Sequence, residues 1–395
     1  MLRTNRSVEK KIQTIEGELI ISRYVLRPKT NADKEKLKEM DGVTCIYPLD
    51  AALGINVLPF KMTPQLMLRI ARTAIQVPSY ERTESILNSV CNVEISDDTI
   101  RSVTNYLGAL VVNDDSKKAD VAKNIYESDK LDFTKGKEGV LYMSVDGATV
   151  NTRKADDNGS TWRENKLAMA YNSNDITEYK NYEGELCHRI NKRKYAAYIG
   201  GANEFKWRWL ALALEAGYGQ YKETVILSDG APWIRNIQKE LFSDAQRILD
   251  LFHLKENVGD YFKALFPKDS QKEERTERTD KTCEKLENGE WKNVLEDLKQ
   301  YKRRRIPSNV VNLPKYIEDN KDAIDYPTYK NNGYVVGSGA IESSNKTVLQ
   351  SRMKQAGMRW SLEQGRGIVA LKARQESDMW ESVEGLLYKK LGLLN

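Results

Sequence analysis

The sequence predicts an α/β protein in which a helical N-terminal region precedes a core built around a sheet. Between residues 139 and 254, short apolar runs alternate with longer amphipathic segments, which is the pattern of strands alternating with helices. The region before it repeats its apolar residues with helical spacing, and the region after it is helical in pattern and highly charged. These three observations place the sheet in the middle of the chain.

The composition is typical of a water-soluble globular protein. Of the 395 residues, 40% are hydrophobic and 30% are charged, and the net charge is +5. The apolar run Trp209–Leu214 is too short to cross a bilayer, and no apolar signal segment follows Met1. Four scattered cysteines without C-x-x-C spacing suggest neither a disulfide framework nor a zinc site. We therefore expect a cytoplasmic protein without a membrane partner.

The first 112 residues divide into two regions. Residues 1–60 are of uncertain fold, with one strand-like stretch at Glu18–Val25. Residues 61–112 are predicted to contain three helices, which begin at Pro64, span Tyr80–Val90, and run from Asp97 to about Leu110. Helix, short turn and capped helix form the outline of a helix-turn-helix, which predicts a DNA-binding region. A three-helix core without a DNA function is the alternative interpretation.

The central part of the chain follows a polar stretch, residues 113–138, which we interpret as a linker. Residues 139–254 then form the order β-β-β-α-β-α-β. The expected strands are Val140–Val145, Lys166–Tyr171, Tyr195–Ile199, Thr224–Leu227 and Arg247–Leu251, and the expected helices are Glu204–Ala216 and Pro232–Phe242. Residues 255–333 are predicted to be a helical insertion, and residues 334–395 a helical C-terminal part of the core.

Three carboxylates are candidates for the chemistry. Asp146 and Asp229 each follow a buried strand and precede a glycine, an arrangement that places a carboxylate at an open sheet edge. A single Asp-Gly is usually a turn, but two after strands of one sheet favour a site. Glu342 lies among apolar neighbours, which is unusual for a surface glutamate. Three such groups could hold two Mg²⁺ or Mn²⁺ ions and support in-line phosphodiester displacement.

Basic residues gather around Glu342. The segment from Glu342 to Arg374 has seven basic and two acidic residues, which suggests a polyanionic substrate, although a solvated helix face would look the same. Trp360 could stack on an unpaired base or pack in the core. The candidate DNA-binding residues are Lys346, Arg352, Lys354, Arg359 and Trp360.

Several segments resemble DDE transposases of bacterial insertion sequences, in particular the ISLre and ISKra groups. The matching segments are Leu227–Ile234, Leu249–His253, Gly337–Lys346 and Arg352–Ser361. The resemblance implies a ribonuclease-H-like catalytic core, with the first Asp on the first strand, the second at the end of the fourth, and the Glu on a late helix. Asp146, Asp229 and Glu342 match these places and are the implied catalytic and metal-binding residues.

The resemblance also implies partners and supporting residues. Asp250 and His253 resemble a motif of the Mutator-like relatives and would orient a catalytic carboxylate or DNA. The alternative interpretation is that His253 is a packed residue without a catalytic role. The family binds terminal inverted repeats and target DNA, works as a homo-oligomer in a synaptic complex, and in a bacterial cell would associate with the nucleoid. Some members carry N-terminal cysteine pairs, but here only Cys45 lies in that region.

Two rival functions remain open at this point. A ribonuclease-H-like nuclease or resolvase would cleave nucleic acid without strand transfer, and the fold does not distinguish it from a transposase. A DNA-binding protein derived from a transposase would retain the helix-turn-helix and lose catalysis. The resemblance over Glu342–Ser361 favours transposition over the nuclease, and the presence of all three carboxylates argues against the DNA-binding protein that has lost catalysis.

Overall fold

The computed structural model describes residues 2–91, 94–184, 186–302, 304–337 and 339–393. The chain forms two compact units. The first unit comprises Met1–Asp114, Thr152–Lys154 and Gln350–Asn395, and the second comprises Asp115–Asn151 and Ala155–Leu349. Among the helices described, none combines the length and the apolar character that crossing a bilayer would require.

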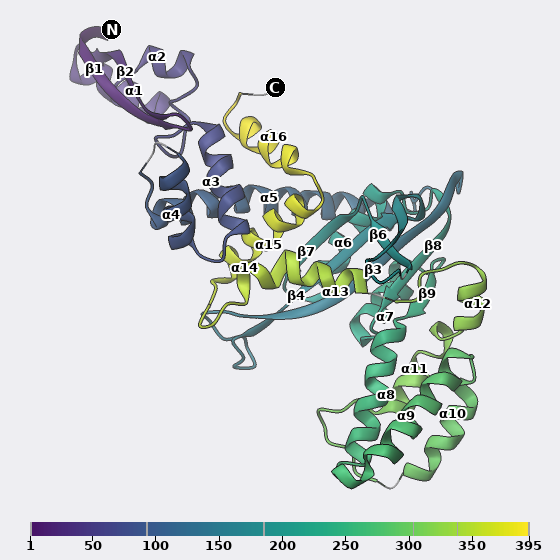
Figure 1. The fold of residues 1–395 in the computed structure, drawn as a ribbon. Helices are drawn as coiled ribbons and strands as arrows, with labels where there is room; N and C mark the ends of the chain where they lie inside the picture. The colour runs from purple at the N-terminus through teal and green to yellow at the C-terminus, as the bar shows by residue number, and fades with distance from the viewer. Residues whose placement is uncertain (1, 92–93, 185, 303, 338, 394–395) are drawn as a thin grey trace. The chain divides into compact units, whose positions relative to one another are not determined.

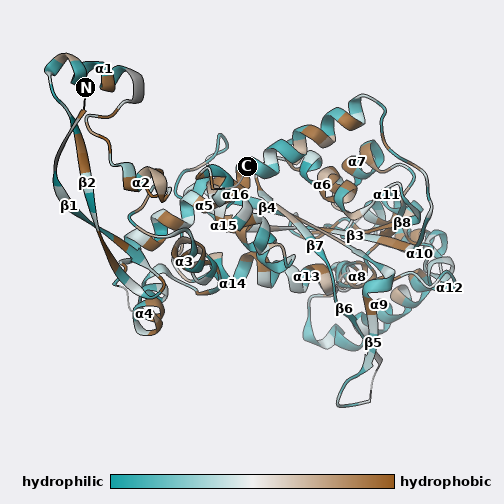
Figure 2. Ribbon diagram, turned by 90° about the horizontal axis from the view of Figure 1, so that it is seen from above, coloured by the Kyte–Doolittle hydropathy of each residue, from teal (hydrophilic) through white to brown (hydrophobic). Residues whose placement is uncertain are grey.

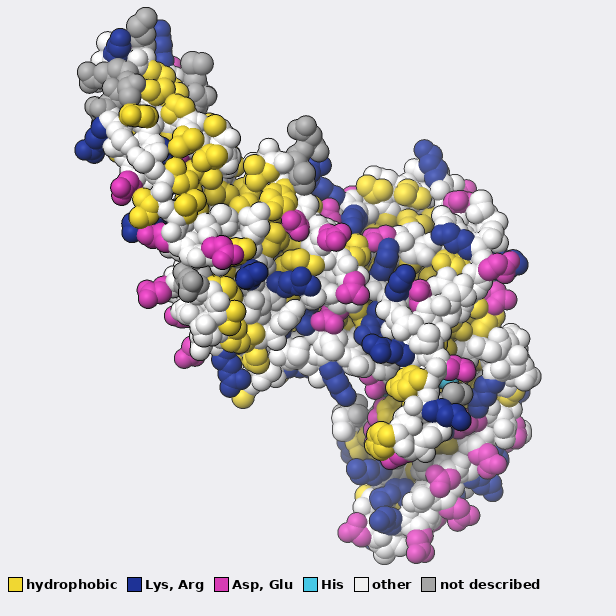
Figure 3. Space-filling model, turned by 45° about the horizontal axis from the view of Figure 1, so that its top comes forward, with side chains coloured by type: hydrophobic (Ala, Val, Ile, Leu, Met, Phe, Trp, Pro, Cys, Tyr) yellow, Lys and Arg dark blue, Asp and Glu magenta, His cyan; other side chains and the backbone are white. Residues whose placement is uncertain are grey.

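The first unit begins with a long β-hairpin. Strands β1 (Leu2–Thr14) and β2 (Gly17–Pro28) pair antiparallel, and helices α1 (Asn31–Asp41) and α2 (Pro48–Ala52) follow (Figure 1). β2 contains the strand-like stretch that the sequence predicts. Leu19, Ile20 and Tyr24 of β2 are exposed, and apolar side chains are visible over this part of the chain in Figure 3.

The three helices expected in residues 61–112 are present. They are α3 (Pro64–Gln76), α4 (Tyr80–Val90) and α5 (Asp97–Glu127). The Ser96 hydroxyl accepts a hydrogen bond from the Thr99 amide at 3.3 Å, as expected for a helix cap. Ile70 of α3, Leu87 of α4 and Val103 of α5 are buried, so each helix contributes an apolar face to the unit.

The predicted linker at residues 113–138 is wrong for most of its length, because α5 continues to Glu127. Residues 111–127 contain neither glycine nor proline, so nothing in them ends the helix. Ala119 and Ala122 are buried at helical spacing, while the charged residues lie on the other faces. Only residues 128–136 connect α5 to the next strand.

The first unit is completed by C-terminal helices. These are α14 (Ser351–Met353), α15 (Leu362–Glu376) and α16 (Trp380–Lys390). The Ser361 hydroxyl accepts from the Gln364 amide at 3.3 Å and so caps α15. Asp378, with φ of 54°, separates α15 from α16. α15 meets α5 where Gly367 faces Gly108.

The second unit contains a five-stranded mixed sheet in the order β7-β4-β3-β8-β9. The strands are β3 (Lys137–Asn151), β4 (Trp162–Asn172), β7 (Lys194–Ile199), β8 (Tyr221–Ser228) and β9 (Gln246–Leu249). β3, β8 and β9 are parallel, and β4 is antiparallel to β3 and β7. Helices α6 (Ala202–Ala216) and α7 (Pro232–Leu241) complete the predicted order β-β-β-α-β-α-β.

The two faces of the sheet are covered by different helices. Met143 and Val145 of β3 pack with Trp209 of α6 and Ile234 of α7, and the hydrophobic colour of the central strands in Figure 2 reflects this core. α13 (Gly339–Asn345) contacts β3 and β4 on the opposite face. Because side chains alternate along a strand, Asp146 lies on the face of α13.

Two features of the sheet differ from the prediction. The first strand does not end at Asp146, because it continues to Asn151 by pairing with β4. A separate hairpin, β5 (Ile176–Lys180) and β6 (Leu186–Ile190), is inserted between β4 and β7. Its β5 side chains are mostly exposed and polar, so it lacks the apolar alternation that marks a half-buried strand.

The predicted helical insertion is confirmed as helical. It contains α8 (Leu251–Leu265), α9 (Lys272–Glu287), α10 (Trp291–Leu298), α11 (Leu313–Asp319) and α12 (Tyr326–Asn331). Short 3₁₀ turns lie at Ser173–Asp175, Asp269–Gln271, Lys299–Tyr301 and Lys321–Ala323, and a π-helical turn at Lys346–Gln350 follows α13. On the face seen in Figure 3, basic and acidic side chains are interspersed over the insertion.

Candidate functional site

Asp146 and Asp229 lie at neighbouring positions of two parallel strands. Val145 of β3 is in register with Ser228, the last residue of β8. Asp146 and Asp229 are the residues that directly follow this pair. Their carboxylates therefore lie at the same edge of the sheet, where β8 ends. Two residues that are 83 positions apart in sequence therefore become neighbours, as the two Asp-Gly motifs predict.

The Asp146 carboxylate is held at both oxygens. Oδ1 accepts from the Gly147 amide at 2.7 Å, and Oδ2 accepts from Asn345 Nδ2 at 2.6 Å. Burial raises the pKa of Asp146 above its ordinary value, and the charge of Asp229 raises it further, while the Gly147 and Asn345 hydrogen bonds lower it. The side chain is therefore fixed in orientation, and burial disfavours its charged form.

Asp229 is held by the loop that it begins. Its Oδ1 accepts from the Ala231 amide at 2.9 Å, just before α7 starts at Pro232. Its backbone carbonyl accepts from the Tyr316 hydroxyl at 2.6 Å, which ties the loop to α11. Burial raises the pKa of Asp229, and the charges of Glu164 and Asp250 add to this, whereas His253 opposes it.

Asp250 and His253 form the start of α8 beside these carboxylates. The Asp250 amide donates to the Ser228 carbonyl at 2.9 Å, and its buried carboxylate caps α8 by accepting from the His253 amide at 2.7 Å. His253 Nδ1 lies 3.3 Å from Asp250 Oδ1, an ion-pair distance without the angles of a hydrogen bond. The motif therefore holds His253 beside the candidate carboxylates.

Glu342 of α13 reaches the same histidine. Its Oε1 is 3.9 Å from His253 Nδ1, and it is a buried oxygen without a hydrogen-bond partner in the described structure. The contact with Asp250 raises the pKa of His253 to about 9, and the charges of Asp250, Asp229 and Glu342 contribute, against the effect of burial. His253 is therefore positively charged at neutral pH and lies between acidic groups.

Asn345 belongs to the site although sequence reasoning did not select it. It lies three residues after Glu342 on α13, so both side chains project from neighbouring positions of one helix face. It is 2% exposed, and its Oδ1 is buried without a hydrogen-bond partner. The sequence contains a signal for Asn345, because its amide lies three residues after the candidate catalytic Glu342 in the same predicted helix.

Glu164 was also missed. It lies on β4, its charge raises the pKa of Asp229, and it forms an ion pair with the buried Lys166. Gly147 leaves room for it, because a Cβ at Gly147 would lie 2.3 Å from Glu164 Oε1. The glycine after Asp146 thus makes space for a fourth carboxylate, which no motif in the sequence indicates.

The donor chemistry of this edge fits a hard cation. Asp146 and Asp229 are adjacent carboxylates whose pKa values are raised mainly by burial, and Glu342 Oε1 and Asn345 Oδ1 are unpaired buried oxygens. Among the described residues, however, no three His, Cys, Asp or Glu side chains are grouped as a metal site. Glu342 is directed towards His253, so the predicted three-carboxylate cluster is not assembled in this arrangement.

The candidate DNA-binding residues are divided between the two units. Lys346 is exposed in the second unit, and Lys354 and Arg359 are exposed in the first. The prediction that Arg352 contacts DNA is wrong, because this residue is only 1% exposed. Its Nε donates to the Ala74 carbonyl and its Nη1 to the Pro78 carbonyl. It joins C-terminal residues to α3 and is not available to a phosphate.

Trp360 packs in the interior of the first unit. It is buried, its Nε1 donates to the Met353 carbonyl at 3.2 Å, and the Arg352 guanidinium lies 5.0 Å from its ring centre. Of the two roles considered for Trp360, core packing is the one that this environment supports.

Comparison with known protein families identifies a match. The model of the uncharacterised protein family UPF0236 matches residues 28–386, which include the whole second unit, most of the first and every candidate site residue. A search of curated proteins finds no match to the chain.

Proposed function

This chain belongs to the uncharacterised protein family UPF0236, and we propose that it is a DDE transposase with a ribonuclease-H-like catalytic core. The observation that carries the proposal is the adjacency of Asp146 and Asp229, one residue beyond the last paired residues of β3 and β8. The strand order β7-β4-β3-β8-β9 supports the proposed core, as do the segments that resemble ISLre and ISKra transposases.

Some residues of the site would bind metal ions, and others would orient the metal-binding carboxylates. Asp146 and Asp229 would hold two Mg²⁺ or Mn²⁺ ions, with Glu342 completing one of the two sites. Bound ions would supply positive charge for the attacking and leaving oxygens of an in-line phosphodiester displacement. The Gly147 and Ala231 amides and Asn345 fix the two Asp side chains, so that they need no reorientation when charge develops.

Two successive reactions would use this one site. Water first opens a phosphodiester bond at the end of the element, and the freed 3′-hydroxyl then attacks a phosphodiester bond of the target DNA. Asp250 would keep His253 protonated and in place beside Glu342. Residues 61–112 would bind the terminal inverted repeats, Lys346, Lys354 and Arg359 would contact phosphates, and a synaptic homo-oligomer would bring two ends together.

The test is a strand-transfer assay with purified protein, Mg²⁺ and DNA carrying the element ends. Asp229→Asn keeps the shape of the side chain and removes its charge, so we expect both cleavage and joining to fall by about 10³-fold or more, as for groups acting in the transition state. Asp269→Asn, on the short turn before α9, is the matched control and should retain activity. Thermal unfolding checks that both variants are folded.

Each rival function has a distinct outcome in this assay. Full activity in a folded Asp229→Asn variant would show that the site is wrongly assigned. Cleavage without joining would identify a nuclease or resolvase. Specific binding of element ends without cleavage would identify a DNA-binding protein derived from a transposase.

A further inference from the structure

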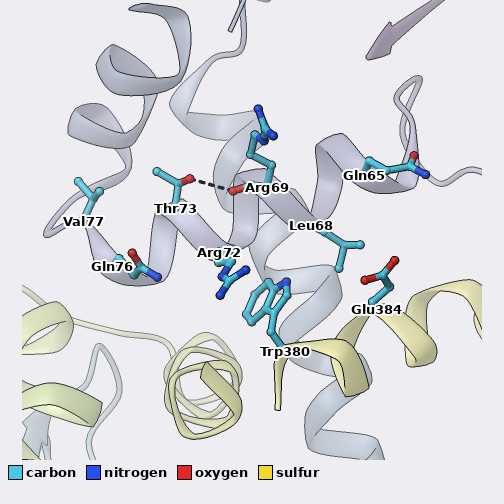
Figure 4. A pocket seen from close by; sticks show the side chains of 9 residues that line it. All are labelled: Gln65, Leu68, Arg69, Arg72, Thr73, Gln76, Val77, Trp380 and Glu384. Carbon is cyan, nitrogen blue, oxygen red and sulfur yellow. Dashed lines mark hydrogen bonds between the residues drawn. The ribbon is translucent and has the colours of Figure 1, made fainter. Parts of the chain in front are cut away.

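A groove runs between α3 and α16 within the first unit. Its volume is about 600 Å³, which is in the range of small-ligand sites. Figure 4 shows α3 providing one wall, while Trp380 and Glu384 project from α16 on the other side. The candidate catalytic residues all lie in the second unit, so the groove is a separate feature.

The α3 wall is a polar stripe on an otherwise apolar helix. Gln65, Arg69, Arg72 and Gln76 are exposed and follow one another at spacings of four, three and four, which places them on one face. The opposite face of α3 is buried in the unit, including Leu66, Ile70 and Ala74. The stripe therefore consists of the amide and guanidinium groups that proteins use to contact nucleic acids.

Arg72 and Trp380 form a platform inside the groove. Arg72 Nε donates to Gln375 Oε1 at 2.8 Å, and its guanidinium carbon lies 5.6 Å from the centre of the Trp380 ring. Trp380 is only half-buried, and Figure 4 shows its ring beside Arg72. A guanidinium held in this way over a half-buried indole places an aromatic ring and a positive charge next to each other in the groove.

Glu384, the acidic residue that lines the groove, interacts with Tyr388 of the same helix. Burial raises the pKa of Tyr388, and the charge and hydrogen bond of Glu384 raise it further. The same hydroxyl accepts a hydrogen bond from Gln65 Nε2 at 3.0 Å. Glu384 is thus part of a chain of contacts with Tyr388 and Gln65, while Arg69 and Arg72 leave the groove with a net positive charge.

We propose that this groove binds an unpaired nucleotide of a DNA strand. The base would stack on the Trp380–Arg72 platform, and Arg69 would contact the adjoining phosphate. In a duplex each base is stacked on its neighbours, so only an unpaired base can present its face to an indole in a groove. The choice of DNA as the ligand rests on the proposed function, because strand cleavage and joining at element ends can expose unpaired nucleotides. The stacking of a base on Trp380 does not depend on the proposed function.

Binding is tested with the full-length protein in EDTA, so that no catalysis contributes. The probes are a fluorescein-labelled single strand of thymidines, a blunt duplex of equal length, and thymidine monophosphate as a competitor. We expect Arg69→Ala and Trp380→Leu each to weaken single-strand binding by about tenfold, and Trp380→Phe to retain most of it, because phenylalanine can still stack. Duplex binding should be unchanged by Trp380→Leu.

Arg27→Ala is the matched control, since it removes the same charge from an exposed position of β2, outside the groove and outside residues 61–112. Arg69 is exposed, so its variant should fold normally, and thermal unfolding checks the Trp380 variants. The proposal is overturned if folded Arg69→Ala and Trp380→Leu bind the single strand normally. It is also overturned if Trp380→Leu weakens duplex binding as much as single-strand binding, or if thymidine monophosphate binds as tightly as the strand.

The same measurements separate this proposal from the proposed function. Asp229→Asn should bind the single strand normally while losing strand transfer. Normal strand transfer together with a groove that binds no strand would remove the groove proposal alone. Groove binding in a protein without cleavage activity would remove only the transposase.

Discussion

At the scale of single residues, Asn345 connects α13, which carries Glu342, to Asp146 of β3. Its Nδ2 donates to Asp146 Oδ2 at 2.6 Å, while Glu342 lies one turn earlier on the same helix. A hydrogen bond to the charged form of an acid lowers its pKa, so removing this bond should raise the pKa of Asp146, which burial already raises.

The first prediction follows from this bond. Asn345→Ala should lower DNA cleavage by about tenfold or more and shift the acid limb of the pH–rate profile to higher pH, since Asp146 must be deprotonated to act. Ser343→Ala, at an exposed position of the same helix, is the control and should leave the profile unchanged. An Asn345→Ala profile with an unmoved acid limb would show that the bond does not tune Asp146.

The second prediction concerns His253. The ordinary pKa of 6.5 is raised to about 9, first by Asp250. A raised histidine pKa stabilises the fold fully below pH 6.5, and this stabilisation is lost as the pH rises through about 9. Denaturant unfolding of the metal-free protein should therefore show stability falling over this interval, and Asp250→Asn should flatten the fall.

Nuclear magnetic resonance can follow the same proton directly, because the chain has only two histidines. Mg²⁺ held by the neighbouring carboxylates would repel the imidazolium, so we expect added Mg²⁺ to lower the pKa of His253. A titration curve that does not move with saturating Mg²⁺ would count against a metal site at this edge.

At the scale of elements, the first unit depends on a close helix crossing. A Cβ at Gly108 of α5 would lie 2.7 Å from Gly367 Cα of α15, which is backbone that cannot easily move. This is the third prediction: Gly108→Ala should destabilise the protein by about 1–3 kcal/mol in urea unfolding, the usual effect of overpacking. Loss of the crossing would appear as a lower transition midpoint.

Gly385 provides the matched control. It lies within α16 and has nothing within 4 Å of its would-be Cβ, so Gly385→Ala should stabilise the helix by about 0.5–1 kcal/mol. If both substitutions have the same sign, the crossing at Gly108 is not a packing constraint.

Element ends were predictable where local chemistry decides them. The predicted helix starts at Pro64 and Asp97 agree with the structure, because a proline or the Ser96 capping side chain acts within one turn. The prediction of a linker at residues 113–138 is wrong up to Glu127, because a polar, exposed helix face has the same composition as a linker. The hairpin β5–β6 was missed because exposed β5 has no apolar alternation.

At the scale of the whole molecule, DNA affinity should depend strongly on salt. The net charge is only +5, so the proposed DNA binding would come from local phosphate contacts, each of which releases counterions. The fourth prediction is that Lys354→Ala and Arg359→Ala each reduce the slope of log affinity against log salt by about one, across all DNA sequences. Anisotropy titrations between about 50 and 200 mM salt measure this slope.

Arg352→Ala should behave differently. The guanidinium is buried, so its removal should leave the salt slope unchanged and destabilise the protein by about 1–3 kcal/mol for each of the two carbonyls that lose their donor. A changed slope in a normally stable Arg352→Ala variant would place this arginine on the DNA after all.

The order of the five strands of the main sheet with α6 and α7, and the adjacency of Asp146 and Asp229, could be inferred from the sequence alone. Apolar runs mark buried strands, and parallel strands bring their carboxyl ends to one edge, so both follow from local pattern and sheet geometry. Asn345, Glu164, the contact of Glu342 with His253, and the burial of Arg352 emerged only from the tertiary structure. They depend on which side chains meet across distant segments, and that is decided by packing and not by the spacing of residues along the chain.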